Sequence, residues 1–205
     1  MTCVGLTGGI GAGKTTVARM FSYRGAWVVE ADRIIHHLLM PQGPACKPVS
    51  SIWGDAVCTG EGRIDRKRLA SIVFKDRDAL NRLVDILYPL LKHEVTQAMA
   101  RAKHLHAVMF ILDGSQILEA GWEGMFDLIV LVRARGDVCR ERMLRRGIMD
   151  PEQFRLRRGL QWPEWVKTRH ADFIIDNSGS RHMTERAVNG VFDQIVGDTG
   201  RNCRM

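Results

Sequence analysis

The glycine-rich segment Gly8–Thr15 constrains the fold more than any other part of the chain, which has 205 residues. It reads GGIGAGKT and matches the pattern G-x-x-x-x-G-K-[ST] in full. The apolar run Val4–Thr7 directly precedes it, and a helical pattern begins at Lys14. A glycine-rich turn between a strand and a helix points successive backbone N–H groups at one anion, and the positive end of the helix adds to the attraction. The segment therefore predicts a phosphate-binding loop in an α/β fold.

The side chains at the end of this loop predict the ligand. Lys14 is expected to reach the β- and γ-phosphates of ATP, and the Thr15 hydroxyl is expected to ligate Mg²⁺. Thr16 can add a hydroxyl to the α-phosphate. The backbone that would surround the phosphates belongs to Gly9, Ile10, Gly11, Ala12 and Gly13. ATP and Mg²⁺ are thus the predicted nucleotide and metal.

Short apolar runs alternate with longer amphipathic stretches along the chain, as in an α/β fold with a mostly parallel sheet. The runs are apolar throughout, as is typical of strands buried on both faces. The predicted strands are Cys3–Thr7, Trp27–Ala31, Ala107–Leu112, Asp127–Val132 and Phe173–Ile175. The predicted helices are Lys14–Tyr23, Arg33–Leu39, Arg66–Phe74, Asp78–Lys103, Asp137–Arg146, Pro151–Gln161 and Arg181–Val196, and Pro89 is expected to bend or split the fourth. The segment Met40–Ile64 is interpreted as loop and short elements.

Two of the predicted strands lead into aspartates. In open parallel sheets ligands bind beyond the carboxyl ends of the strands, which puts Asp32 and Asp113 at the edge where the phosphate loop lies. Asp32 is a candidate general base that deprotonates an attacking hydroxyl, or a residue that caps the next helix. Asp113 has the pattern of a carboxylate that holds Mg²⁺ directly or through water, or of one that starts a turn before Gly114.

The positive charge is concentrated in one late segment. The chain has 30 Lys and Arg against 23 Asp and Glu, a net charge of +7. Eleven basic and five acidic residues fall between Arg133 and Arg169, so this segment carries +6 of it. Arginine suits phosphate binding, and a lid over the reacting phosphates excludes water. Most of these side chains fit a solvated face equally well. The concentration favours polyphosphate ligands, and we expect neither nucleic acid nor membrane as a partner.

Other functional classes fit the sequence less well. A GTPase should carry Asn-Lys-x-Asp, and no asparagine here is followed by lysine. A nucleic-acid-binding protein should spread its charge along a groove with stacking aromatics, which make up only 7% of this chain. The odd number of cysteines, five with no C-x-x-C pair, is typical of free thiols in a reducing cytoplasm.

The chain resembles the dephospho-CoA kinase family from about Val4 to Gly179, nearly its whole length. The loop is shared by many families, but the ordered set of motifs is more specific. The motifs are Gly5–Thr15, Glu30-Ala31-Asp32, Gly62–Arg66 with Leu69 and Val73-Phe74, Leu87–Leu90, Asp113 with Leu118-Glu119, Arg142, Arg146, Gln161, Ala171-Asp172 and Ile175–Asn177.

The resemblance implies a function and a set of site residues. Family members phosphorylate the 3′-hydroxyl of the dephospho-CoA ribose with ATP, the last step of coenzyme A synthesis. By resemblance, Asp32 is the catalytic base, Arg142 and Arg146 belong to the lid, and Asn177 lies near the adenine. A long helical hairpin near Tyr88 and Glu119 is expected to face the coenzyme.

The resemblance also implies the architecture. We expect a P-loop NTPase three-layer fold with a five-stranded parallel sheet, a helical CoA-binding insertion and a lid. Its core would span about 1–32, 105–140 and 170–205, its acceptor-binding region about 33–104 and its lid about 141–169. A monomer or weak homo-oligomer is expected.

Three positions depart from the family pattern. Glu30 stands where the family has Asp, Tyr88 replaces His, and Ser115-Gln116-Ile117 replaces Pro-Leu-Leu. These departures concern the acceptor site more than the reaction. A related P-loop kinase that acts on a nucleoside or nucleoside monophosphate is the alternative.

Overall fold

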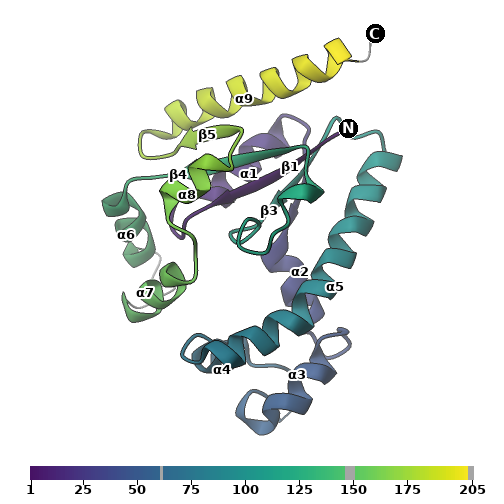
Figure 1. Cartoon of the computed structure of the whole chain (residues 1–205), viewed down its shortest axis with the longest axis vertical. Helices are drawn as coiled ribbons and strands as arrows, with labels where there is room; N and C mark the ends of the chain where they lie inside the picture. Colours follow the sequence, from purple (N-terminus) through teal and green to yellow (C-terminus); the bar gives the residue numbers. More distant parts are fainter. Residues whose placement is uncertain (61, 146–150, 203–205) are drawn as a thin grey trace. The chain divides into compact units, whose positions relative to one another are not determined.

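The computed structural model describes residues 1–60, 62–145 and 151–202 of the chain (Figure 1). The chain divides into two compact units. The first unit comprises Met1–Val29 and Met99–Met205, and the second unit comprises Glu30–Ala98. The second unit starts three residues before the predicted acceptor-binding region and ends six residues before its predicted end.

The first unit is built on one five-stranded parallel sheet, as predicted. The strands are β1 (Thr2–Gly8), β2 (Trp27–Glu30), β3 (Met109–Asp113), β4 (Leu128–Arg133) and β5 (Phe173–Asp176). Their order across the sheet is β2-β3-β1-β4-β5. Leu6 of β1 is in register with Asp113 of β3 and Val130 of β4. The central strand therefore delivers the glycine-rich loop beside the carboxyl ends of β3 and β4.

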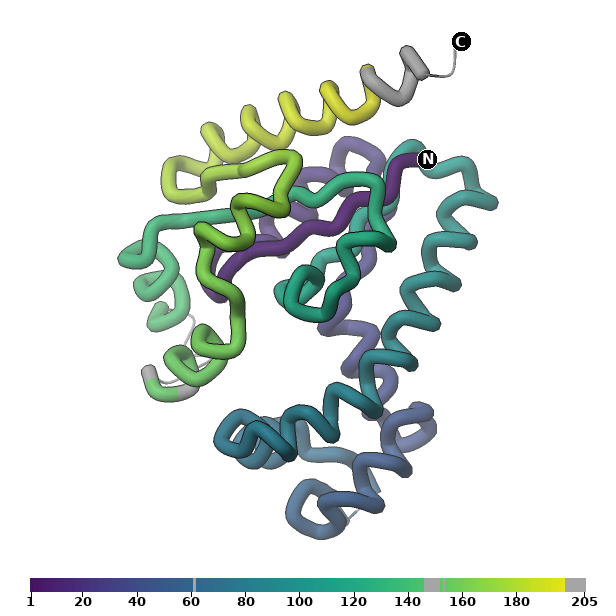
Figure 2. Tube along the Cα trace, in the orientation of Figure 1, coloured from purple at the N-terminus to yellow at the C-terminus, as the bar shows by residue number. Residues whose placement is uncertain are grey.

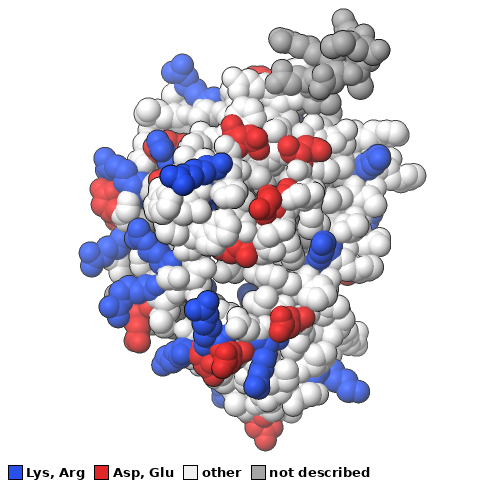
Figure 3. Space-filling model, viewed as in Figure 1, with Lys and Arg blue, Asp and Glu red and all other residues white. Residues whose placement is uncertain are grey.

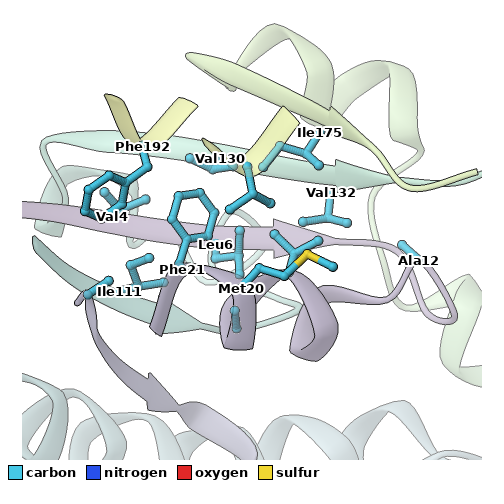
Figure 4. Close-up of a cluster of buried hydrophobic side chains, with 14 of the residues drawn as sticks. Val4, Leu6, Ala12, Met20, Phe21, Ile111, Val130, Val132, Ile175 and Phe192 are labelled. Carbon is cyan, nitrogen blue, oxygen red and sulfur yellow. The ribbon is translucent and has the colours of Figure 1, made fainter. Parts of the chain in front are cut away.

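A hydrophobic core joins helices α1 (Lys14–Tyr23) and α9 (Arg181–Asn202) to the sheet (Figure 4). Val17 and Phe21 lie four residues apart on α1, on one face of the helix, and both are fully buried. Phe192 of α9 packs against Phe21, with their ring centroids 6.5 Å apart. Burying side chains of this size stabilises the fold by about 1.5–3 kcal/mol each.

Strand β3, an inner strand of the sheet, explains why the predicted strands lack an alternating pattern. All of its residues are buried, including neighbours such as Phe110 and Ile111 that point to opposite faces. Both faces of the sheet are thus covered, and an apolar residue is needed at every position.

The remaining helices of the first unit follow β4 and β5. They are α6 (Gly136–Arg145), α7 (Pro151–Gly159) and α8 (Glu164–Arg169), with a short 3₁₀ helix η2 (Glu123–Met125) before β4. Helix α8 packs on β4. The sequence did not predict α8 as a separate helix because its apolar pattern covers less than two turns.

The second unit is a run of helices that Figure 2 traces from purple-blue to teal. They are α2 (Ala31–Leu38), α3 (Cys46–Trp53), the 3₁₀ helix η1 (Gly54–Ala56), α4 (Arg66–Val73) and α5 (Arg77–His104), which ends in the first unit. Asp65 begins α4 because its carboxylate accepts hydrogen bonds from the N–H groups of Lys67 and Arg68. Helix α5 continues through Pro89 as one helix, so of the predicted bend or split the split does not occur. A long helix can absorb the lost hydrogen bond at one proline.

The described cysteines, Cys3, Cys46, Cys58 and Cys139, carry free thiols. None of the helices in the described ranges combines the length and the apolar character that a bilayer crossing requires.

Candidate active site

The glycine-rich loop connects β1 to α1 and takes a conformation that needs glycine, as Gly11 and Gly13 show. Gly11 and Gly13 have φ angles of 81° and 90°, in the left-handed region that L side chains rarely adopt. A Cβ at Gly11 would collide with the backbone of Cys139, and one at Gly13 with the side-chain amide of Asn177. The loop is therefore wrapped closely by other parts of the first unit.

The structure brings the two predicted metal-binding residues together. The Thr15 hydroxyl, at the start of α1, donates to Oδ2 of Asp113 at 3.1 Å. Asp113 is buried at the end of β3, because its strand neighbours are buried on both sides. Beside them, Nζ of Lys14 donates to the Gly8 carbonyl at 3.2 Å, so the lysine lies along its own loop.

Thr15 and Asp113 fit a magnesium ion by their chemistry. Mg²⁺ prefers hard oxygen ligands and is bound through one or two protein groups, waters and phosphate oxygens. A hydroxyl and a carboxylate beside a phosphate loop are ligands of that kind. Among the described residues, no group of three or more His, Cys, Asp or Glu forms an all-protein metal cage.

The carbonyl oxygen of Ala12 faces away from the glycine-rich loop into the protein. It accepts a hydrogen bond from Nδ2 of Asn177 at 2.7 Å and one from the Arg142 guanidinium at 3.4 Å. The same guanidinium donates to the backbone carbonyl of Asn177 at 2.8 Å. The structure thus places Asn177 and Arg142 against the loop. Any contact of Asn177 with adenine stays a prediction, as does a catalytic role of Arg142.

The turn that carries Asn177 is fixed at both ends. Asp176 accepts hydrogen bonds from the hydroxyl and backbone N–H of Ser178, and these bonds, with the nearby Arg133, hold the pKa of Asp176 below its usual value. The Ser178 hydroxyl in turn accepts from the N–H of Arg135 at 2.9 Å. The end of β5 and the residues after β4 therefore hold each other in place.

A third side chain, that of Gln161, also contacts the loop. Oε1 of Gln161, located between α7 and α8, accepts a hydrogen bond from the Ile10 N–H at 2.9 Å. Sequence reasoning noted Gln161 without a role. A single amide more than 150 positions away from its partner leaves no local pattern by which to find it.

Glu119 was predicted by resemblance to bind the acceptor, near a long helical hairpin that is also near Tyr88, and this role stays a prediction. Glu119 lies in the first unit, in a run of turns between Gly114 and Gly121, whereas Tyr88 lies on α5 in the second unit. Oε1 of Glu119 forms an ion pair with the buried Lys167 at 2.7 Å. Lys167 also donates to the Ser115 carbonyl at 2.9 Å, which ties α8 to the turn after β3.

A cavity of about 520 Å³ lies beside the glycine-rich loop. It is lined by residues of the loop, of β4 and of the segments around α6, α7 and α8: Gly9, Ile10, Ala12, Leu131, Ala134, Gly136, Cys139, Arg158, Gly159, Gln161, Trp162, Pro163, Glu164 and Lys167. Burial is the main cause that raises the pKa of the Cys139 thiol above its ordinary value. Cys139 is therefore a packing residue of this wall and a poor nucleophile.

The remaining predicted residues lie elsewhere. Thr16 is in the first turn of α1. Asp32 is exposed in the first turn of α2, in the second unit. The residue that caps α2 is Glu30, without a side-chain bond, so the capping interpretation of Asp32 is wrong. Tyr88 is half-buried on α5. Arg146 lies outside the described residues.

The basic segment predicted as a lid forms α6, α7 and α8. On the face seen in Figure 3, Lys and Arg side chains stand out along the edge where Figure 1 places α6 and α7, with acidic side chains between them. Arg135 pairs with Asp137, and Arg145 pairs with Glu141, all with well-exposed side chains. Arg135 and Arg145 are therefore partly neutralised by acidic neighbours in solvent.

Comparison with known proteins gives concordant results. The family model described as dephospho-CoA kinase matches residues 2–182. The dephospho-CoA kinase of Aquifex aeolicus is 39% identical over 199 residues, which cover 97% of this chain and 100% of that protein. TT1252 from Thermus thermophilus has a TM-score of 0.80 at 29% identity, covering 94% of this chain and 97% of that one. The dephospho-CoA kinase from Campylobacter jejuni shares the fold, with a TM-score of 0.71 at 22% identity over 96% and 98% of the two chains.

Proposed function

The chain belongs to the dephospho-CoA kinase family, and from this premise we propose that it phosphorylates the 3′-hydroxyl of the dephospho-CoA ribose with ATP. In the reaction the bond between the γ-phosphorus and the β–γ bridging oxygen breaks. A bond forms between the γ-phosphorus and the 3′-oxygen, and the hydroxyl proton is taken up by a base. The products are coenzyme A and ADP.

The glycine-rich loop is the proposed ATP phosphate site. Its left-handed glycines bring backbone N–H groups close to an anion, and the N-terminus of α1 adds positive potential. Lys14 would leave the Gly8 carbonyl and neutralise charge on the β- and γ-phosphates. Arg142, already beside the loop, would stabilise charge that spreads over the transferred group.

Thr15 and Asp113 are the proposed ligands of Mg²⁺, Thr15 directly and Asp113 directly or through water. When bound, the ion neutralises charge on the β- and γ-phosphate oxygens. The hydrogen bond between the two side chains supports this assignment, because it holds both oxygens together at the end of the loop.

Asp32 is the proposed general base. It follows β2 by two residues, it is exposed, and no helix-capping bond occupies its carboxylate. A carboxylate within reach of the 3′-hydroxyl would orient it and accept its proton. The second unit, which contains Asp32 and Tyr88, is the proposed acceptor-binding region.

The observation that carries the proposal is the contact between Thr15 and Asp113 at the end of a complete phosphate loop, in a chain that matches the family over residues 2–182. The test is ADP formation by the purified protein with ATP and dephospho-CoA, compared with adenosine and AMP as acceptors at equal ATP. We expect kcat/KM for dephospho-CoA to exceed that for either alternative by at least about 100-fold. Equal or faster turnover of a nucleoside acceptor would assign the chain to another kinase activity.

A further inference from the structure

Thr184 of α9 is a polar residue buried in the first unit that the proposed mechanism does not use. It is fully buried, and its side-chain hydroxyl donates to Oδ1 of Asn177 at 2.9 Å. The same oxygen lies 3.3 Å from the Ser180 carbonyl, one helical turn earlier. A buried hydroxyl that reaches outside its own helix is a specific interaction, because its burial would otherwise cost stability.

Hydrogen bonds at both ends of the amide determine which way the Asn177 side chain points. An amide has one accepting and one donating end, and the Thr184 hydroxyl donates to the accepting end. The donating end, Nδ2, then faces the Ala12 carbonyl at 2.7 Å. Asn177 is itself buried, and its backbone N–H and carbonyl are bound by the Arg133 carbonyl and the Arg142 guanidinium. Both ends of the Asn177 side chain and its backbone N–H and carbonyl thus form hydrogen bonds within the first unit.

The Ala12 carbonyl belongs to the same peptide unit as the Gly13 N–H. In a trans peptide these two groups point in opposite directions. Since the carbonyl is held toward Asn177, the Gly13 N–H points away from it. No residue with a Cβ fits at position 13, because the Cβ would occupy the space of Nδ2 of Asn177.

We propose that Thr184 and Asn177 are positioning residues that set the Ala12–Gly13 peptide so that the Gly13 N–H faces the phosphate of the bound nucleotide. Thr184 acts through Asn177, and Asn177 acts through the Ala12 carbonyl. This proposal deepens the proposed function, on which it rests for the identity of the nucleotide. It also assigns the Asn177 side chain to the phosphate end of the nucleotide site and not to recognition of the base.

The first test removes the hydroxyl while keeping the shape of the side chain, in Thr184→Val. ADP binding in Mg²⁺ buffer is measured by calorimetry, together with KM for ATP and for dephospho-CoA. We expect the affinity for ADP to fall about three- to tenfold, which corresponds to the loss of one hydrogen bond. KM for ATP should rise by the same factor, and KM for dephospho-CoA should stay within about twofold, because the change is confined to the phosphate loop.

Two variants serve as matched controls. Thr184→Ser restores the hydroxyl and should recover most of the ADP affinity. Thr96→Val removes a hydroxyl on α5 that donates to the carbonyl of Lys92, one helical turn earlier. Thr184 contacts the carbonyl one turn earlier in the same way, but Thr96 is exposed and, within the described part of the chain, makes no bond to Asn177. It should leave ADP affinity within about twofold of the parent protein. An unchanged ADP affinity in Thr184→Val, or an equal loss in Thr184→Ser, would overturn the proposal.

Asn177→Asp provides a second test that keeps Thr184 intact and replaces only the donating end of the amide. It should raise KM for ATP and for GTP by about the same factor of ten or more, since both nucleotides carry the same phosphates. A change confined to ATP would show that Asn177 reads the base and would overturn the proposal. ADP binding needs no acceptor, so a failure of the proposed acceptor specificity would leave these measurements interpretable.

Discussion

The two units of the chain hold their polar side chains in different ways. In the first unit, buried polar and charged side chains bond partners far away in the sequence, as Asn177 does with Ala12 and Lys167 with Ser115. In the second unit, the polar side chains are mostly exposed and many bond within their own turn, as Asp65 and Thr96 do, although Arg66 also bonds His36. Among the described residues, the buried polar side chains are all in the first unit: Thr7, Asp113, Lys167, Asn177 and Thr184.

This difference has a physical meaning for phosphoryl transfer. Transfer depends on groups that already point at developing charge, and buried hydrogen bonds hold such groups without reorganisation. Local caps start helices but do not fix one part of the chain against another. The proposed phosphate site is thus pre-arranged by buried hydrogen bonds, while the proposed acceptor-binding region relies mainly on apolar packing and exposed hydrogen bonds.

The largest expected effect is at Lys14. Lys14→Ala should lower kcat/KM by about 10³-fold and weaken ATP binding, because a cation on the β- and γ-phosphates is lost. Steady-state kinetics and ADP calorimetry measure both. Arg19→Ala, which removes an exposed cation from the same helix, is the control and should stay near parent activity. A similar loss in both variants would mean that helix charge in general, and not Lys14, is responsible.

Lys167 tests the claim that buried charges hold the first unit together. Lys167→Ala leaves the Glu119 carboxylate buried without its cation and should cost about 3 kcal/mol of unfolding free energy or more. Urea denaturation measures it. Arg145→Ala breaks an exposed pair with Glu141 and should cost no more than about 0.5 kcal/mol. Equal costs would remove the distinction between the two kinds of pair.

Asp32 tests the second unit's part in the chemistry. Asp32→Asn should lower kcat about 10²-fold, the scale of a lost general base, and leave ADP affinity within about twofold. The control is Asp55→Asn, which changes another exposed carboxylate of the same unit. Near-parent kcat in Asp32→Asn would exclude it as the base.

Tyr88 is expected to have a smaller effect, confined to the acceptor. Tyr88→Phe should raise KM for dephospho-CoA about three- to tenfold at unchanged kcat and unchanged KM for ATP. Tyr23→Phe, at the other tyrosine of the chain, is 83% exposed on the first unit and provides the control. If KM for dephospho-CoA does not change in Tyr88→Phe, the hydroxyl makes no acceptor contact.

Asp65 should give the smallest effect, and one that depends on pH. The hydrogen bond from the Arg68 N–H is the main cause that holds the pKa of Asp65 below its usual value. The charged carboxylate therefore stabilises the fold at pH values above the pKa that Asp65 has in the unfolded chain. This contribution is lost as the pH falls through the lower pKa of the folded protein. Asn caps helices as well as Asp, so Asp65→Asn isolates the charge. The variant should have a lower urea midpoint than the parent protein at pH 7 and an equal one near pH 2. A constant difference across this range would show that the charge does not contribute.

The sequence predicted the parts of the fold whose signals are local. Strands such as β3 were recognisable because burial on both faces requires unbroken apolar runs. The loop was recognisable because its backbone takes positive φ angles at Gly11 and Gly13, which favour glycine. Helix α1 was predicted with its observed bounds, since the loop fixes where it begins.

The supporting contacts of the site were beyond sequence reasoning. The pairs Glu119–Lys167, Ile10–Gln161 and Ala12–Asn177 join positions 48 to 165 residues apart, and each rests on one side chain with no repeating pattern around it. Resemblance marked several of these residues, but a motif carries no information on which hydrogen bonds its side chains make.

The most direct test of the account is the identity of the product formed from ATP and dephospho-CoA. Mass spectrometry and ³¹P NMR of the reaction mixture determine how many phosphates are added and to which oxygen. We predict coenzyme A, with one new phosphomonoester on the 3′-oxygen, an intact pyrophosphate bridge and one ADP formed for each product molecule. ADP formation without modified dephospho-CoA, or a phosphate at another position, would contradict the account.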